Sequence, residues 1–418
     1  MPVLKLTTSQ RRKAFALALA LVACACGLRP DAFARQQQPP AQGTRPRRVG
    51  SPAPEPRRPA GESGTARTAD GGREEVDEND VVRVETQLIN VPAVVTDRTG
   101  RPLANLRAEN FALYEDGQPQ RIASFATTEA PFEVALLLDT SGSTRAEVGL
   151  IRRAALAFIE LLRPGDRVAV LSFSTAQDGP EKLAVVEVKS GLTSDREALR
   201  EAVGSIGASN GTPFYDGLER VAAEIFREPP REEARGRRAL VALTDGVDSS
   251  SSTDYEEARQ ALRRAGLVAY FVQVNTEEFV ESRLLQDCED DGALRLSRSQ
   301  MQRYRRLFAP GADAADYGSF CRLGQFERMD ISRKLYRLAR AEMNDLARDS
   351  GGRTFPVMDL QEARAAFRQV AQEIGTQYSL GYYPTNKARD GRFRTIRVQV
   401  RGVKDAQVRA REGYVPGS

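Results

Sequence analysis

Four short, continuous apolar runs, separated by helical patterns, constrain the fold of this chain more than any other feature. The runs read VALLL, VAVLSF, ALVAL and LVAYFVQV, between residues 134 and 274. Each run is bounded by turn residues, which is typical of strands buried on both faces of a parallel sheet. After the first run, apolar residues recur at helical spacing until Pro164-Gly165 ends the helix. This alternation predicts a doubly wound α/β domain.

Strand patterns without intervening helices flank this domain on both sides. Residues 81–130 alternate with period two and contain an Asp116-Gly117 turn, which predicts a few short strands. This β module is too small to close a core alone. Because residues 377–418 return to strand patterns, we expect the two ends to pair. The predicted fold class is α/β with a mostly parallel sheet, plus an accessory β-sandwich built from N- and C-terminal strands.

The α/β domain itself is predicted to span residues 131–376. Helices are expected within it at residues 148–162, 195–203, 213–226, 255–264, 333–348 and 360–376. Residues 275–332 lose this regularity, are rich in arginine and include the acidic stretch DCEDDG. We therefore interpret residues 275–332 as an insert on one edge of the domain.

The first 34 residues resemble an export signal, because a basic region precedes the short apolar core AFALALALVACAC. That core is too short to span a membrane as a permanent helix. Two processing routes fit: cleavage after AFA at residues 32–34, or lipidation of Cys24, since LVAC resembles a lipobox. Residues 35–80 contain no Leu, Ile, Met or aromatic residue, which predicts a disordered tether. We expect a periplasmic, secreted or lipid-anchored protein, exported across the cytoplasmic membrane.

Histidine is absent from all 418 residues. This excludes Ser-His-Asp and Cys-His nucleophiles and any zinc site that contains histidine. A net charge of +4 is small for this length and does not predict nucleic-acid binding. Two cysteines follow the leader, Cys288 and Cys321. They are expected to pair in an oxidising compartment, and two unpaired thiols are the alternative.

Oxygen-bearing side chains stand where several predicted strands end. Asp139, Ser141 and Ser143 alternate directly after the first run, in LLLDTSGST, so an extended segment would project them to one side. Thr212 comes just before a helix, and Asp245 just after the third run. Ligands of open α/β sheets bind at the carboxyl ends of strands, where these side chains would converge. Hard oxygens suit Mg²⁺, with Mn²⁺ or Ca²⁺ as alternatives, whereas loop and helix capping is the structural alternative.

Asp-x-Ser-x-Ser, followed by GTPFYDGL and LTDG, resembles the metal-ion-dependent adhesion site of von Willebrand factor type A domains. The resemblance covers about residues 132–274, and the flanking strands resemble a bacterial group of secreted proteins with a related domain. It implies metal ligation, directly or through water, by the hydroxyls of Ser141, Ser143 and Thr212. It also implies that Asp139 and Asp245 lie in or next to the coordination sphere.

The resemblance further implies that an open coordination position accepts a carboxylate from a partner protein. We therefore predict an exported, metal-dependent binding protein of the adhesion type, with a membrane contact only through a lipid anchor. An enzyme is not expected, because no histidine is present as a general base and no P-loop or G-x-S-x-G motif is found. The alternatives are a structural envelope component with a vestigial site and a metal-dependent hydrolase.

Overall fold

The computed structural model describes residues 88–127, 129–144, 147–178, 181–234, 236–285 and 295–416. The predicted signal peptide, the predicted tether, Cys24 and Cys288 lie outside these residues. Within the described ranges, no helix is both long enough and apolar enough to cross a membrane.

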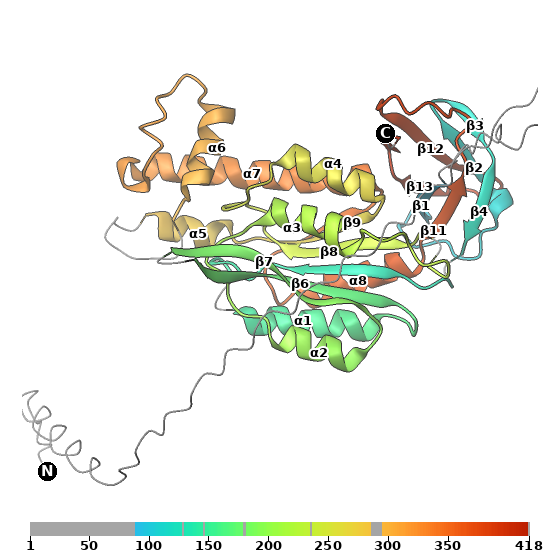
Figure 1. Cartoon of the computed structure of the whole chain (residues 1–418), viewed down its shortest axis with the longest axis horizontal. Helices are drawn as coiled ribbons and strands as arrows, with labels where there is room; N and C mark the ends of the chain where they lie inside the picture. The colour runs from blue at the N-terminus through green and yellow to red at the C-terminus, as the bar shows by residue number, and fades with distance from the viewer. Residues whose placement is uncertain are drawn as a thin grey trace, which may run out of the picture. The chain divides into compact units, whose positions relative to one another are not determined.

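A six-stranded sheet forms the centre of the α/β domain (Figure 1), with the order β10-β9-β8-β5-β6-β7. Neighbouring strands are parallel except for β6 and β7, which are antiparallel. The strands span Glu133–Leu138 (β5), Arg167–Asp178 (β6), Glu181–Thr193 (β7), Arg238–Thr244 (β8), Val268–Val274 (β9) and Arg353–Val357 (β10). The four predicted apolar runs are β5, β6, β8 and β9, so the predicted fold class is confirmed.

The two strands at the ends of this sheet, β7 and β10, were not predicted from the sequence. Both lie at an edge, where only part of a strand is buried, so β10 has no continuous apolar run and β7 has only the four-residue run LAVV. Lysine and glutamate interrupt β7, and Pro356 interrupts β10, which an edge strand tolerates because its outer side forms no ladder.

Helices cover both faces of the sheet, because side chains along each strand alternate between them. Leu136 and Leu138 of β5 pack in one apolar cluster with α1, α2 and α8, and Leu137 packs in the opposite cluster with α3, α4 and α7. The helices are Val148–Leu161 (α1), Arg196–Gly204 (α2), Phe214–Arg220 (α3), Tyr255–Ala265 (α4), Glu277–Leu284 (α5), Arg298–Phe308 (α6), Gln325–Ser350 (α7) and Ala363–Gly375 (α8). A π-helical segment, Val221–Ile225, continues α3 directly.

The region interpreted as an irregular insert contains two helices, α5 and α6, and the beginning of a third. Helix α7 starts at Gln325, eight residues before the helix expected at residue 333. Helix α6 buries only three side chains, those of Gln300, Met301 and Tyr304, so few apolar residues mark its buried face in an arginine-rich sequence. A capping box at Ser297 nevertheless defines its first turn.

Strands from both ends of the chain form two four-stranded antiparallel sheets with the orders β13-β1-β11-β4 and β14-β12-β2-β3. They span Ile89–Thr96 (β1), Phe111–Glu115 (β2), Gln118–Gln120 (β3), Ile122–Ala126 (β4), Tyr378–Tyr382 (β11), Arg394–Val400 (β12), Gln407–Ala410 (β13) and Gly413–Tyr414 (β14). Their side chains share one apolar cluster, which includes Val91, Leu113, Tyr378 and Ile396. The predicted pairing of N- and C-terminal strands is therefore present, and a turn with positive φ at Asp116 and Gly117 joins β2 to β3.

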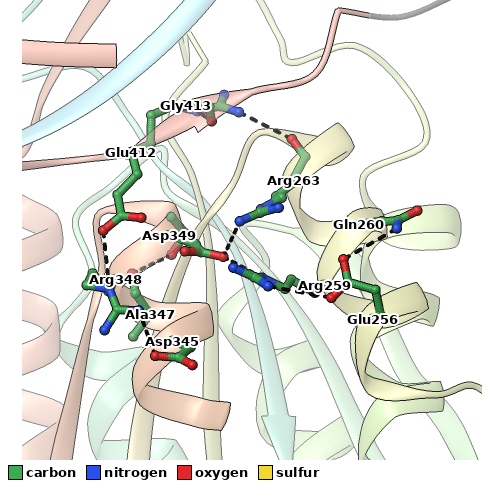
Figure 2. Close-up of polar contacts among 12 residues, drawn as sticks. Glu256, Arg259, Gln260, Arg263, Asp345, Ala347, Arg348, Asp349, Glu412 and Gly413 are labelled. Carbon is green, nitrogen blue, oxygen red and sulfur yellow. Dashed lines mark hydrogen bonds and ion pairs between the residues drawn. The ribbon is translucent and has the colours of Figure 1, made fainter. Parts of the chain in front are cut away.

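The end of α7 contacts both α4 and the C-terminal strands (Figure 2). The Asp349 carboxylate accepts hydrogen bonds from Arg259 Nε at 2.6 Å and from Arg263 Nη2 at 2.7 Å. The backbone N–H of Glu412 donates to the Asp349 carbonyl at 3.1 Å. Asp349 is 6% exposed, so these contacts hold a buried charge at the point where α4, α7 and the C-terminal strands meet.

Gly352 follows α7 and enters β10, which pairs with β9. A Cβ atom at this position would collide with the backbone carbonyl oxygen of Ala269 in β9. Backbone cannot move aside as a side-chain end can, so the close approach of these two strands requires glycine.

We therefore expect Gly352→Ala to lower the free energy of unfolding by about 1–3 kcal/mol, because β9 and β10 must separate. Gly204→Ala is the matched control, since Gly204 ends α2 and a Cβ there meets no atom within 4 Å. The control should remain at least as stable as wild type. Equal urea midpoints for the two variants would contradict the proposed close approach.

Asp349→Asn should lower the free energy of unfolding by about 2 kcal/mol, because it removes the negative charge that two arginines share. Asp345→Asn is the control, since Asp345 pairs with Arg348 at the surface, where both side chains are well exposed. That change should stay within about 0.5 kcal/mol of wild type. Thermal and urea unfolding followed by circular dichroism measure both values.

Candidate metal centre

The two carboxylates predicted to face one another follow neighbouring parallel strands. Leu138 of β5 pairs with Leu243 of β8. The ladder continues one step further, because the Asp139 backbone N–H donates to the Leu243 carbonyl at 2.9 Å. Asp139 and Asp245 therefore leave the same edge of the sheet side by side, and both are almost fully buried.

The loop after β5 folds back so that its serines approach Asp245. The Ser141 backbone N–H donates to Asp139 Oδ1 at 3.0 Å, which turns the chain sharply. The Oγ atoms of Ser141 and Ser143 then lie 3.4 Å apart. Ser143 Oγ donates to Asp245 Oδ2 at 3.0 Å. This contact joins the ends of β5 and β8 through side chains.

Thr212 is brought to the same place by the loop that precedes α3. Its backbone N–H donates to Ser249 Oγ at 2.8 Å, and the Ser249 N–H donates to the Thr212 carbonyl at 3.0 Å. Thr212, Ser141, Ser143 and Asp245 line one cavity of about 120 Å³. Asp139 lies behind these residues, where it is 1% exposed. The structure therefore brings together all five side chains that the sequence analysis selected.

Burial dominates the electrostatics of the two carboxylates. Burial and the nearby Asp245 charge raise the pKa of Asp139 to about 7, and burial also raises the pKa of Asp245. No arginine or lysine of the described residues forms an ion pair with either carboxylate. A bound cation would offset this repulsion and favour the ionised forms.

The donor set fits a hard divalent cation. Carboxylates and hydroxyls are oxygen donors of the kind that Mg²⁺, Mn²⁺ and Ca²⁺ prefer. Among the described residues, no group of three or more Asp, Glu or Cys side chains is placed to hold a metal ion. The centre formed here differs from such a group, because it combines two carboxylates with three neutral hydroxyls.

Three hydroxyl donors that orient the carboxylates were not selected from the sequence. Thr244 Oγ1 donates to Asp139 Oδ2 at 2.6 Å, and Thr276 Oγ1 donates to Asp245 Oδ2 at 2.6 Å. The Tyr336 hydroxyl lies 2.7 Å from Thr276 Oγ1. Thr244 ends β8 and Thr276 closely follows β9, and such positions can be recognised in the sequence. Tyr336 lies within α7, where no sequence pattern marks it as part of the site.

Two neighbouring aspartates have structural contacts instead. Asp248 accepts a hydrogen bond from the Phe214 N–H at 2.9 Å, at the start of α3. Asp216 accepts from the N–H groups of Ser252 and Thr253. Asp248 thus caps the start of α3, and Asp216 holds the loop that precedes α4.

The stretch interpreted as an edge insert lies against this centre. Ser297, the residue that caps α6, donates its Oγ proton to the Ser249 carbonyl at 2.7 Å. Val280, Leu284 and Leu335 line the same cavity as the site hydroxyls. Sequence periodicity could not place this stretch, because the contacts that hold it are long-range. The predicted disulfide to Cys321 stays a prediction, since Cys288 is outside the described residues.

The family sequence model of the von Willebrand factor type A domain matches residues 133–298 of this chain. The chain contains a von Willebrand factor type A domain. The resemblance inferred from the sequence motif is thereby confirmed. Domains of this family commonly mediate protein–protein interaction, are generally not enzymes and often bind a divalent metal at the adhesion site.

Solved structures similar to this chain include other proteins with such domains. The conserved hypothetical protein BatB from Bacteroides thetaiotaomicron is 17% identical, with a TM-score of 0.34, over 58% of this chain and 97% of that chain. A von Willebrand factor type A protein from Catenulispora acidiphila is 14% identical, with a TM-score of 0.35, over 73% of each chain. A search of curated proteins by sequence found no match.

Proposed function

We propose that this chain is an exported protein that binds another protein through a divalent metal, most simply Mg²⁺, at its von Willebrand factor type A domain. One observation carries the proposal: Ser143 bonds Asp245 across two strand ends, beside a second buried carboxylate. A pair of buried carboxylates surrounded by neutral hydroxyls is a suitable environment for a cation and a poor one without it.

The residues of this chain would hold the ion in two ways. Ser141, Ser143 and Thr212 supply hydroxyl oxygens, and Asp139 and Asp245 supply carboxylates in or next to the coordination sphere. Because three of the five donors are neutral, a bound Mg²⁺ would keep much of its positive charge and attract an acidic side chain of a partner. Thr244 and Thr276 hold the carboxylates in orientation.

Export rests on the sequence of the first 34 residues, which has the basic and apolar parts of a signal segment. Cleavage after residue 34 and lipidation of Cys24 would place the domain free or anchored in the envelope. A structural envelope component with a vestigial site is the second candidate function. Metal-dependent hydrolysis is the third, although no histidine is present to act as a base.

Asp139→Ala is expected to abolish both Mg²⁺ binding and metal-dependent retention of the partner, because it removes one of two buried carboxylates. Isothermal titration with Mg²⁺ measures the first effect, and a pull-down from an envelope extract with Mg²⁺ or EDTA measures the second. Asp216→Asn is the control, since the Asp216 carboxylate contacts backbone N–H groups and not the centre.

The binding proposal is wrong if Asp139→Ala in EDTA retains the partner as well as wild type does in Mg²⁺. Turnover of a phosphate ester or a peptide that depends on Asp139 would support the hydrolase instead. Circular dichroism verifies that the variant is folded. If Asp139→Ala is unfolded, the milder Asp139→Asn, which preserves the shape of the side chain, takes its place.

Thr276→Val should weaken Mg²⁺ binding roughly tenfold, because Asp245 loses a hydrogen bond that orients it. Thr354→Val is a matched control, since Thr354 Oγ1 is buried in β10 and has no hydrogen-bond partner among the residues that the structure describes. The control should bind Mg²⁺ like wild type and be at least as stable. If both threonine variants lose the same affinity, the orienting role assigned to Thr276 is incorrect.

A further inference from the structure

Strand β7 has an open edge at one end of the central sheet (Figure 1). In the described sheet its neighbour is β6 alone, so the backbone groups on its other side form no ladder. Its 13 residues include the uncharged run LAVV at residues 183–186. Native proteins usually protect sheet edges with charged residues or proline. An edge left open over an apolar run is a place where an extended segment of another chain can add as a strand.

The carbonyls of Lys182 and Val186 show which backbone groups of β7 point away from β6. The Lys182 carbonyl accepts a hydrogen bond from Asn210 Nδ2 at 2.8 Å, and the Val186 carbonyl accepts one from Arg220 Nη1. Both donors are side chains outside β6, so these two carbonyls lie on the open side of β7. Alternate residues of a strand direct their backbone groups to the same side, so the N–H and C=O of Ala184 also face outward.

A groove of about 860 Å³ lies beside this edge. Its volume is within the roughly 300–1,000 Å³ of ligand sites in proteins. Residues 183–186 of β7 form one side, and Ser250 and Ser252 also line the groove, whereas none of the five side chains of the metal centre does. The opposite side comes from α3 and the residues that follow it, with Asp216, Glu219, Arg220, Ala223, Glu224, Arg227 and Glu228.

The α3 side of the groove is acidic. Four of its side chains are carboxylates and two are guanidinium groups. Arg220 Nε lies 2.6 Å from the Glu224 carboxylate, so one of the two cations is already paired. Glu219 and Glu228 are exposed at the groove. Basic side chains of a bound segment would therefore meet charges of the opposite sign.

The two faces of β7 differ beside the groove. Val186 packs in the apolar cluster that contains α3, so Ala184, two residues earlier, points to the same face. Leu183 and Val185 point to the other face, where the Leu183 side chain is 43% exposed. An added strand alternates in the same way, so one set of its side chains meets the acidic wall and the other set lies beside Leu183.

We propose that β7 binds an extended segment of a partner protein in which basic and aliphatic residues alternate. The segment adds to the sheet through main-chain hydrogen bonds to Ala184 and its neighbours. Its basic side chains contact Glu219 and Glu228, and its aliphatic side chains cover Leu183. This interaction surface is separate from the metal centre and requires no metal.

A second copy of this chain is a less suitable occupant. Pairing of two β7 edges about a two-fold axis would place the acidic α3 sides of both copies next to one another. The carboxylates of Glu219 and Glu228 would then approach their symmetry mates, and like charges repel. A basic segment gains from the same wall.

Binding of labelled peptides to the full chain in EDTA tests the proposal, with fluorescence anisotropy as the measurement. The probe is Val-Lys-Val-Lys-Val-Lys-Val, and the charge-reversed control has glutamate in place of lysine. We expect the control to bind at least roughly tenfold more weakly. N-methylation of one alternate set of residues should abolish binding, because it removes the N–H groups that pair with β7. N-methylation of the other set should change affinity by less than about twofold.

Variants of the chain localise the binding. Ala184→Pro should abolish peptide binding and preserve the fold, because an edge strand tolerates proline where the missing N–H faces outward. Glu219→Gln combined with Glu228→Gln should weaken binding severalfold, and both exposed positions should leave the fold intact. Glu201→Gln is the matched control, since Glu201 is an exposed glutamate of α2, on the opposite face of the sheet, and it should alter no affinity.

Three results would overturn this inference: equal binding of the two N-methylated peptides, full binding by Ala184→Pro, or a dimer in solution that Ala184→Pro dissociates. The last result would assign the edge to a second copy, and light scattering measures it. If Ala184→Pro is unfolded, the glutamine variants and the N-methylated peptides decide. Because all peptide measurements are made in EDTA, failure of the proposed metal-dependent function would leave this inference unaffected, and the reverse also holds.

Discussion

Parallel pairing of β5 with β8 is the interaction on which the site depends. It places Asp139 and Asp245 at one edge of the sheet, and no loop contact could do so with the same rigidity, because both strands are buried in the middle of a six-stranded sheet. A shift of this pairing would move one carboxylate along the strand axis by about 3.3 Å per residue and separate the donors. The apolar clusters on both faces fix the register, since the alternating side chains of β5 are divided between them. The register of β5 and β8 therefore determines both the packing of the core and the geometry of the site.

Neutral groups do most of the work of orienting the two carboxylates. Hydroxyl and backbone N–H donors surround Asp139 and Asp245, whereas two other buried carboxylates, Glu133 and Asp349, are paired with arginine. An arginine would neutralise the charge that a cation needs. With neutral donors around them, burial raises the pKa of both Asp139 and Asp245.

Much of the fold and of the candidate site was predictable from the sequence, because local residue patterns determine it. Continuous apolar runs predicted the central strands. The alternation of Asp139, Ser141 and Ser143 selected the right residues, but the segment is a tight turn after Asp139 and not the extended segment expected from the sequence. Thr212 and Asp245 followed from their positions at strand and helix ends. The contributions of Tyr336 and Leu296 could not be predicted, because each acts through contacts with residues far away in the sequence. Edge strand β7 was missed because charged residues surround its four-residue apolar run LAVV, as partial burial at a sheet edge allows. Local sequence patterns therefore predict the central strands, whereas tertiary contacts determine the remaining parts of the site.

The β-sandwich has a consequence for how the chain is made. Its strands β1 to β4 are synthesised before the α/β domain, but their partners follow that domain: Glu115 and Tyr382, which hydrogen-bond in its interior, are 267 residues apart. At about 5–20 residues per second, the early strands wait on the order of tens of seconds for β11. During that interval the unpaired edges of β1 and β4 are exposed, while the α/β domain between them is being completed. Closing the sandwich therefore follows synthesis of the α/β domain, and a chain truncated before β11 would display those edges permanently.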